Sequence, residues 1–352
     1  MNQILGLFAG SNGEDVPTRE VGPMKISQIL VHPIKARLCR GTSVQQAKFT
    51  PQGLQYDREW CLIDPEKRKV LTAREIPKMV LITPTIETDP SSPDGGTLTV
   101  SFPLDSAIPS FEIPLRPSEA TLSKWDVLDG LKIWSHTTDG YLVPASSSSS
   151  PSPSSILSEY TGRQVQLVYK GPAPRSCDPT QLFPGLDATV RYQDGYPWLV
   201  CSEEALEAVR AQVGEWAGRE EGLRMGIEER WKSEKVPMER FRPNIVLSGS
   251  GVPFIEDSLE EISILPSKAN GNASETPVSL VAKCPRCLLP NVDPQAGVRD
   301  KAVPFKVLMK FRTGIDPENM KTPCFGCNGV PHGEGLVCVG DEVSITKWIE
   351  AP

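Results

Sequence analysis

The sequence lacks the features of a membrane-spanning, secreted or nucleic-acid-binding protein. No stretch of its 352 residues approaches the ~18 consecutive apolar residues that span a bilayer. The short apolar run at the start has no basic flank, so it does not fit a signal peptide. Lys and Arg number 37 against 44 Asp and Glu, a formal net charge of −7 that is poorly suited to neutralising nucleic-acid phosphates. We therefore expect an intracellular, cytoplasmic protein with no transmembrane segment and no nucleic-acid partner.

Motifs that would hold an electron-transfer group are missing too. The sequence shows no haem-binding or flavin-binding signature, no G-x-G-x-x-G motif and no internal repeat. Its nine cysteines are an odd number in a chain without a secretion signal, which favours a reducing compartment where thiols are free, metal-bound or catalytic. A redox reaction at such a protein would need electrons from separate proteins.

The distribution of turn residues predicts a β-rich α+β fold. The chain has 34 prolines and 28 glycines, and Gly, Pro and Asp clusters separate short apolar or alternating runs. Strands are expected near residues 26–31, 60–63, 80–82, 98–100, 131–134, 244–247, 259–265, 278–282, 335–339 and 342–345. Helices are expected at residues 202–213, 220–231 and 303–312, the first with Ser202 as N-cap.

Composition also suggests how the chain is divided. Residues 1–22 form a polar segment that we expect to be a flexible tail. Two β-rich domains follow, at residues 23–175 and 176–350. The Ser/Pro run at residues 146–155 cannot bury apolar surface, so an exposed loop is expected there.

The strongest local signal is a pair of C-x-x-C motifs. Cys284 and Cys287 form the first, at the end of an expected strand, and Cys324 and Cys327 form the second. Four thiolates can surround a tetrahedral zinc ion, but 36 residues lie between the pairs, against roughly 15–20 in common zinc ribbons. Spacing alone leaves open a structural zinc site, a redox dithiol and unrelated buried thiols. Because Gly326 tolerates positive φ, we expect residues 323–329 to form a tight turn.

An ordered series of motifs resembles the MOSC domain of mitochondrial amidoxime-reducing components and their bacterial relatives. It runs through residues 240–246, 254–258, 284–287 and 292–297. Upstream segments 32–35, 53–60 and 72–74 resemble the β-barrel domain that accompanies MOSC. The similarity covers roughly residues 24 to 347 and implies a MOSC N-terminal β-barrel domain followed by a helix-decorated MOSC β-barrel domain.

The resemblance implies a molybdenum–molybdopterin cofactor and a set of residues that hold it. The family's metal ligand is the second cysteine of the C-x-x-C motif, here Cys287. Cys287 would therefore be both the metal ligand and the catalytic residue, and a soft thiolate suits molybdenum. Cations and N–H donors would hold the pterin and its phosphate. The matching positions are Lys35, Arg58, Gly195, Tyr196, Arg242, Asn244 and Arg286.

Several of these residues have simpler explanations. Arg242 and Asn244 precede an expected strand and could cap a turn, and Lys35 could be an ordinary solvated lysine. Arg58 follows Asp57, so a surface ion pair is the alternative there. Animal members of the family carry hydroxyl residues at positions 195 and 196, so only the backbone groups of Gly195 and Tyr196 can be carried over. Cys324 and Cys327 have no counterpart in the animal proteins.

The implied activity is reduction of N-hydroxylated compounds such as amidoximes. A cytochrome b5-like b-type cytochrome and its NADH-dependent reductase would supply the electrons. The membrane anchor of the animal enzymes is not seen here, so their mitochondrial location cannot be inherited.

One alternative function is that of a cofactor carrier or sulfur-transfer module, because MOSC domains also occur at the C-terminal end of molybdenum-cofactor sulfurases. Those proteins carry a large pyridoxal-phosphate-dependent domain for which this chain has no room. A zinc-stabilised β-barrel binding protein is the other alternative.

Overall fold

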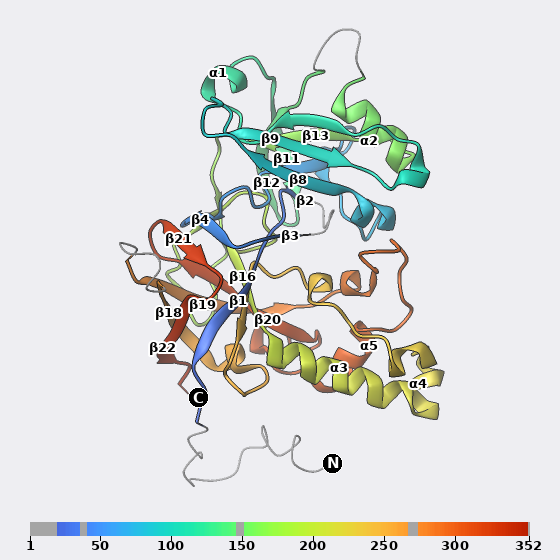
Figure 1. Ribbon diagram of the computed structural model, residues 1–352, viewed down its shortest axis with the longest axis vertical. Coiled ribbons are helices and arrows are strands. Elements are labelled where there is room, and N and C mark those ends of the chain that lie inside the picture. Colours follow the sequence, from blue (N-terminus) through green and yellow to red (C-terminus); the bar gives the residue numbers. More distant parts are fainter. Residues whose placement is uncertain (1–19, 36–40, 146–150, 267–273, 351–352) are drawn as a thin grey trace.

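The computed structural model describes residues 20–35, 41–145, 151–266 and 274–350. Two β-rich units are stacked along the long axis of the molecule (Figure 1). Most of the expected tail, residues 1–19, lies outside the described residues, as do residues 146–150 of the expected Ser/Pro loop. In none of the described ranges does a helix have the length and apolar composition needed to cross a membrane.

The upper unit in Figure 1 is built on a small closed barrel. Five strands pair in the order β13-β12-β11-β7-β6, and β13 pairs back to β6. Their bounds are β6 (Trp60–Asp64), β7 (Lys69–Val70), β11 (Val127–Ile133), β12 (His136–Leu142) and β13 (Gln166–Lys170). The short β2 (Ile34–Lys35) adds to β6 in parallel, and β8 (Thr83–Thr88), β9 (Gly96–Ser101) and β10 (Phe111–Pro114) form a separate sheet.

The lower unit is a larger barrel that the N-terminal strand completes. Seven strands pair in the order β17-β16-β20-β19-β18-β22-β1, and β1 pairs back to β17. Their bounds are β1 (Met24–Val31), β16 (Trp198–Ser202), β17 (Ile245–Ser248), β18 (Leu259–Leu265), β19 (Thr276–Pro285), β20 (Cys324–Pro331) and β22 (Glu342–Trp348). β3 (Thr42–Val44) extends the sheet beside β1, and β21 (Gly335–Cys338) pairs with β4 (Gln46–Thr50), which pairs with β5 (Gly53–Leu54). β1 belongs to the lower unit and β2 to the upper unit, so these two strands tie the units together. The expected β-rich fold with two β-barrels is confirmed.

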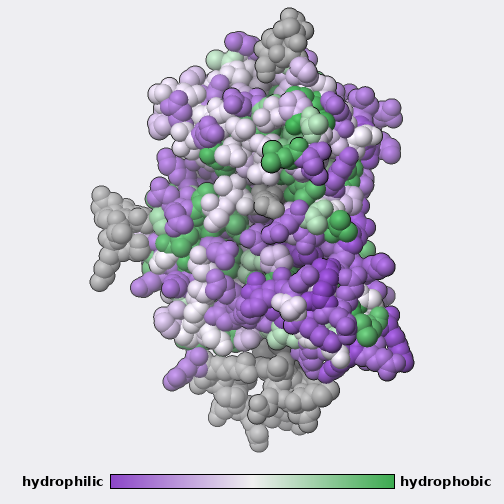
Figure 2. All heavy atoms as spheres, turned by 45° about the vertical axis from the view of Figure 1, so that its right-hand side comes forward, coloured by the Kyte–Doolittle hydropathy of each residue, from purple (hydrophilic) through white to green (hydrophobic). Residues whose placement is uncertain are grey.

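Helices pack against the outside of the lower barrel. α3 (Glu203–Ala217) begins at the predicted N-cap, where the Ser202 hydroxyl accepts a hydrogen bond from the Ala205 amide. α3 packs its apolar side on the barrel and shares a core with α5 (Phe305–Phe311). α4 (Glu220–Arg224) follows α3. Figure 2 shows hydrophilic residues gathered over the lower part of the face that carries these helices. Exposed ion pairs such as Arg224–Glu220 belong to this solvated surface and contribute little stability.

Four local predictions were wrong. The helix expected at 220–231 ends at Arg224, because Gly226 takes a φ of +86°, and a 3₁₀ turn (Glu229–Lys232) follows. The strand expected at 80–82 is instead the end of a 3₁₀ turn (Pro77–Leu81). Part of the expected Ser/Pro loop forms α2 (Pro153–Thr161), since Ser152 caps it and Pro153 fits the first turn. The turn expected at 323–329 is strand β20.

Candidate active site

A cavity of about 380 Å³ lies where the two units meet. It is within the ~300–1,000 Å³ range of small-molecule sites. All eight residues singled out from the sequence line it: Lys35, Arg58, Gly195, Tyr196, Arg242, Asn244, Arg286 and Cys287. The structure thus brings together side chains that lie up to 252 positions apart in the sequence, from Lys35 to Cys287. Their roles toward a cofactor stay a prediction.

Strand ends and the turns beside them deliver these residues. Lys35 closes β2, and Arg58 lies in the turn that leads into β6. Gly195 and Tyr196 precede β16, while Arg242 precedes β17. The Cys284–Cys287 segment begins at the end of β19. Because the polar side chains sit at the ends of paired strands, the two barrels fix the shape of the cavity.

Lys35 is a buried cation rather than a solvated lysine. Its side chain is 2% exposed, and its Nζ lies 2.7 Å from Oδ1 of Asp194. The same carboxylate oxygen accepts a hydrogen bond from the indole Nε1 of Trp134 at 3.1 Å. Asp194 therefore links Lys35 to the indole of Trp134 at the edge of the cavity.

Arg58 forms the ion pair with Asp57 that the sequence suggested. The pair is buried, however, and does not lie on the surface. Its Nη1 donates to Oδ2 of Asp57 at 2.6 Å, and Asp57 has no exposed side-chain surface. Nη1 also donates to the side-chain oxygen of Asn244 at 3.1 Å, and Nη2 donates to the Arg242 carbonyl at 3.3 Å. Arg58 and Arg242 both adopt left-handed backbone conformations, with φ of 52° and 58°. Such conformations are uncommon for non-glycine residues and gather at functional sites.

Asn244 and Arg286 make most of their hydrogen bonds within the protein. The Asn244 amide group bonds the Leu30 carbonyl and the Leu199 amide, which fastens β17 to its neighbours. Nε of Arg286 donates to the Phe325 carbonyl at 2.9 Å, and Nη1 donates to the Phe241 carbonyl at 2.9 Å. Both residues line the cavity, but their bonding fits positioning of the site better than a free grip on phosphate.

The remaining predicted contacts come from Gly195 and Tyr196. The Tyr196 hydroxyl donates to the Asp178 carbonyl at 3.0 Å, so it is engaged by the protein. A Cβ added at Gly195 would meet no heavy atom within 4 Å. The backbone at Gly195 therefore borders open space, where a ligand can approach it closely.

Cys287 is half-buried and sits beside a small apolar cluster. This cluster comprises Ala73, Val80, Leu289 and Val292. Sγ of Cys287 accepts a hydrogen bond from the Leu289 amide at 3.4 Å. Cys284 also lines the cavity but packs against the separate core beneath α3. The two cysteines of the motif thus have different surroundings.

Both cysteines of the second pair are buried on strand β20, and Cys327 belongs to the core of the lower barrel. Burial raises the pKa of the Cys324 thiol to about 12 and holds the pKa of Cys327 well above its usual range. The Cys327 thiol donates to the Glu256 carbonyl at 3.1 Å. Gly326 between them takes a φ of +74°, as its residue type allows, but within strand β20. In the part of the chain that the structure describes, no three His, Cys, Asp or Glu side chains are placed to hold a metal ion, so the geometry gives no support to zinc.

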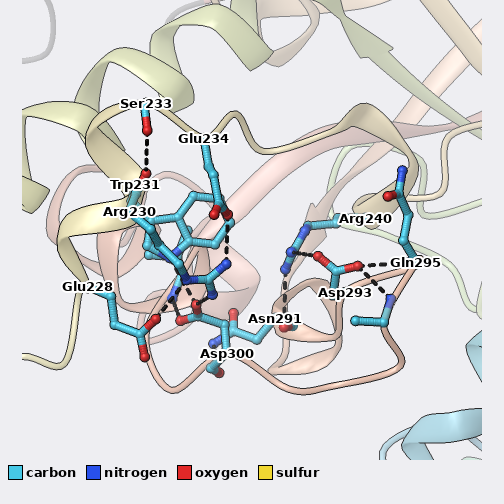
Figure 3. A network of polar contacts seen from close by, with 12 residues as sticks. Glu228, Arg230, Trp231, Ser233, Glu234, Arg240, Asn291, Asp293, Gln295 and Asp300 are labelled. Atoms are coloured by element: carbon cyan, nitrogen blue, oxygen red, sulfur yellow. Dashed lines mark hydrogen bonds and ion pairs between the residues drawn. The ribbon is translucent and has the colours of Figure 1, made fainter.

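A polar network holds the loop that follows Cys287 (Figure 3). Nη1 of Arg240 donates to the Asn291 carbonyl at 3.1 Å, and Nη2 lies 2.7 Å from Oδ2 of Asp293. Asp300 accepts hydrogen bonds from the Trp231 indole at 2.9 Å and from Arg230 at 2.6 Å. The network clamps residues 291–300 to the segment that leads into Arg242, and Arg240 within it lines the cavity.

Sequence reasoning missed eight of the cavity's polar or aromatic residues. These are Arg74, Trp134, Gln193, Asp194, Trp198, Arg240, Phe241 and Asn328. Arg74 and Arg240 stood within segments 72–74 and 240–246, which carried the resemblance, and Asp194 directly precedes Gly195, so their positions were a usable signal. Nothing in the sequence distinguished Trp134.

Two domain families match most of the sequence, in agreement with the fold and the site. The chain therefore belongs to the MOSC family. Residues 23–142 match the MOSC N-terminal beta barrel domain, and residues 187–344 match the MOSC domain.

Among curated proteins, mitochondrial amidoxime-reducing component 1 of Mus musculus is 30% identical over 90% of this chain and 81% of its own length. The Homo sapiens protein of that name is 28% identical over 90% of this chain and 82% of its own length. The chain is similar to these proteins over nearly all of its length.

Proposed function

We propose that this protein is a molybdenum-cofactor-dependent oxidoreductase that reduces N-hydroxylated compounds, amidoximes above all. The observation that carries the proposal is the convergence of a half-buried cysteine and buried cations on one cavity. The names of the amidoxime-reducing relatives support the choice of substrate class.

The residues present fit such a cofactor by the chemistry of their donor groups. Lys35, Arg58 and Arg242 gather positive charge in one cavity of a chain whose formal net charge is −7. An anionic phosphate would be attracted there, and arginine can bind its oxygens in a bidentate way. Cys287 supplies a soft sulfur ligand for the metal. The open space beside Gly195 leaves room for the ligand to approach the backbone.

When bound, the molybdenum cofactor supplies two-electron oxygen-atom transfer. In the overall reaction the amidoxime takes up two electrons and two protons, its N–O bond breaks, and an amidine and water leave. Lys35, Arg58 and Arg242 would bind the phosphate, while Cys287 would hold the metal. Arg286 would orient the cysteine segment through its bonds to the Phe325 and Phe241 carbonyls. The apolar cluster beside Cys287 would keep water away from one side of the sulfur.

A separate electron donor completes the proposal. The sequence offers no haem or flavin signature, so we propose a cytochrome b5-like protein and its NADH-dependent reductase as donors. The eight described cysteines are all free thiols, which supports placement in a reducing compartment inside the cell.

The proposal is tested by metal analysis and activity on one preparation. The full chain is produced in a host that makes the cofactor, its molybdenum and zinc are counted, and benzamidoxime reduction is followed with an artificial reductant. We expect molybdenum near one per chain and formation of benzamidine. Zinc near one per chain without molybdenum would contradict the proposal. Molybdenum without reduction of N-hydroxylated compounds would favour the cofactor-carrier alternative.

A further inference from the structure

Trp134 occupies a backbone position that does not suit a tryptophan. It lies in the two-residue connection between β11 and β12, where Ile133 pairs with His136. Its φ is +55°, in the left-handed region that such hairpin turns usually fill with Gly, Asn or Asp. A bulky side chain with positive φ is strained, and strain of this kind is often retained for function.

The indole nevertheless has two partners at the cavity. Its Nε1 donates to Oδ1 of Asp194 at 3.1 Å, across from the upper unit to the lower. The guanidinium carbon of Arg74 lies 5.0 Å from the centre of the indole ring, a cation–π distance. The residue still has 46% of its surface exposed, and it lines the same cavity as Cys287. Two tethers thus hold a half-exposed aromatic plane at the cavity wall.

The tethers also place the indole at the cationic end of the cavity. Asp194 Oδ1 contacts both the indole Nε1 and Lys35 Nζ, so these two groups lie on one carboxylate oxygen. A ligand whose anionic tail binds Lys35, Arg58 and Arg242 would bring the ring attached to that tail near Trp134. The chemistry that fits an aromatic plane beside a phosphate site is a planar heterocycle carrying a phosphate.

We propose that Trp134 is a further cofactor-binding residue that stacks on the pterin ring of a pterin phosphate. The inference rests on the proposed function, because the pterin is the ring that the molybdenum cofactor would bring. Arg74 and Asp194 act as positioning residues, since they set the plane of the indole. The two units are thereby joined at the ligand, with Trp134 from one and Asp194 from the other.

The test is a binding titration that needs no metal. The full chain is purified from a host unable to make the cofactor, and the oxidised, fluorescent pterin phosphate is added. Trp134→Gly is the main variant, because glycine suits the left-handed turn and the loop should keep its shape. Trp134→Phe keeps a ring without the N–H group. Trp348→Phe is the matched control, since Trp348 on β22 is equally exposed at 46% and does not line the cavity.

The inference predicts that Trp134→Gly weakens binding about tenfold and removes most of the quenching of pterin fluorescence. Trp134→Phe should keep part of both effects, and Trp348→Phe should behave like the wild type. A pterin that lacks phosphate should bind more weakly and show the same Trp134→Gly factor.

The titration distinguishes a failure of the role of Trp134 from a failure of the proposed function. If the wild type binds the pterin phosphate and Trp134→Gly binds and quenches equally well, the role of Trp134 is refuted while the proposed function stands. If the wild type does not bind the pterin phosphate at all, the proposed function fails and this inference fails with it.

Discussion

Arg58→Ala should damage stability and cofactor binding by separate routes. In the folded protein the Arg58 guanidinium lies 2.6 Å from an Asp57 carboxylate that has no exposed surface. Removing Arg58 leaves that carboxylate buried without its cation, while its Oδ1 still accepts a hydrogen bond from the His32 backbone N–H at 2.9 Å. Breaking a buried pair from one side costs about 3–5 kcal/mol. For a protein of this size we expect Tm to fall by roughly 4–7 °C.

The phosphate contact is a second, independent loss. A charge-assisted hydrogen bond to phosphate contributes about 1.5–3 kcal/mol, so Arg58→Ala should weaken cofactor binding roughly ten- to hundredfold. The double variant Asp57→Asn, Arg58→Ala separates the two effects. Its neutral amide is far less costly to bury than a carboxylate, and the amide oxygen can still accept the His32 N–H. We expect the double variant to regain most of the lost Tm but none of the cofactor occupancy.

Stability should be measured on protein made without cofactor, so that ligand binding does not contribute to Tm. Occupancy is measured on protein made with it, by oxidising the released pterin to its fluorescent product. Recovery of occupancy together with Tm in the double variant would show that Arg58 matters only for folding. An unchanged Tm in Arg58→Ala would refute the argument from the buried pair.

Three further predictions concern cysteines and one buried acid. Cys287→Ala should abolish benzamidoxime reduction while most of the pterin stays bound, and Cys284→Ala should be far milder; equal losses would point to a paired thiol site. Burial and the Asp257 charge raise the pKa of Glu256 to about 7, so its ionisation should destabilise the fold as pH rises from 5 to 8. Chemical denaturation should show this fall in wild type but not in Glu256→Gln; identical pH curves would exclude it. The double variant Cys324→Ser, Cys327→Ser should keep activity with both an artificial reductant and the cytochrome system, whereas loss with the cytochrome system alone would reveal a role in electron delivery.

The sequence could predict the parts of the fold that depend on short-range patterns. Strand β18 and the Ser202 cap follow from local alternation and capping chemistry, and both were confirmed. Residues 80–82 show the limit of such patterns, because a short apolar run suits a buried strand and a buried turn equally well. At 323–329 the glycine's positive φ was foreseen, but pairing with β16 and β19 made the segment a strand.

The candidate site, too, could be predicted from the sequence only in part. The resemblance identified the residues that converge on the cavity, since motif order survives where distance along the chain is large. It could not reveal that the Arg286 N–H groups are used by carbonyls of Phe325 and Phe241, because these contacts depend on how two distant segments pack. Trp134 was missed for the same reason: its partners Arg74 and Asp194 meet it only in the folded protein.

The central claim is that Cys287 is the protein's ligand to molybdenum. X-ray absorption at the molybdenum edge counts the sulfur atoms bound to the metal, in wild type and in the Cys287→Ser and Cys284→Ser variants. The account predicts one sulfur neighbour fewer in Cys287→Ser and the wild-type number in Cys284→Ser. An unchanged sulfur count in Cys287→Ser would contradict it.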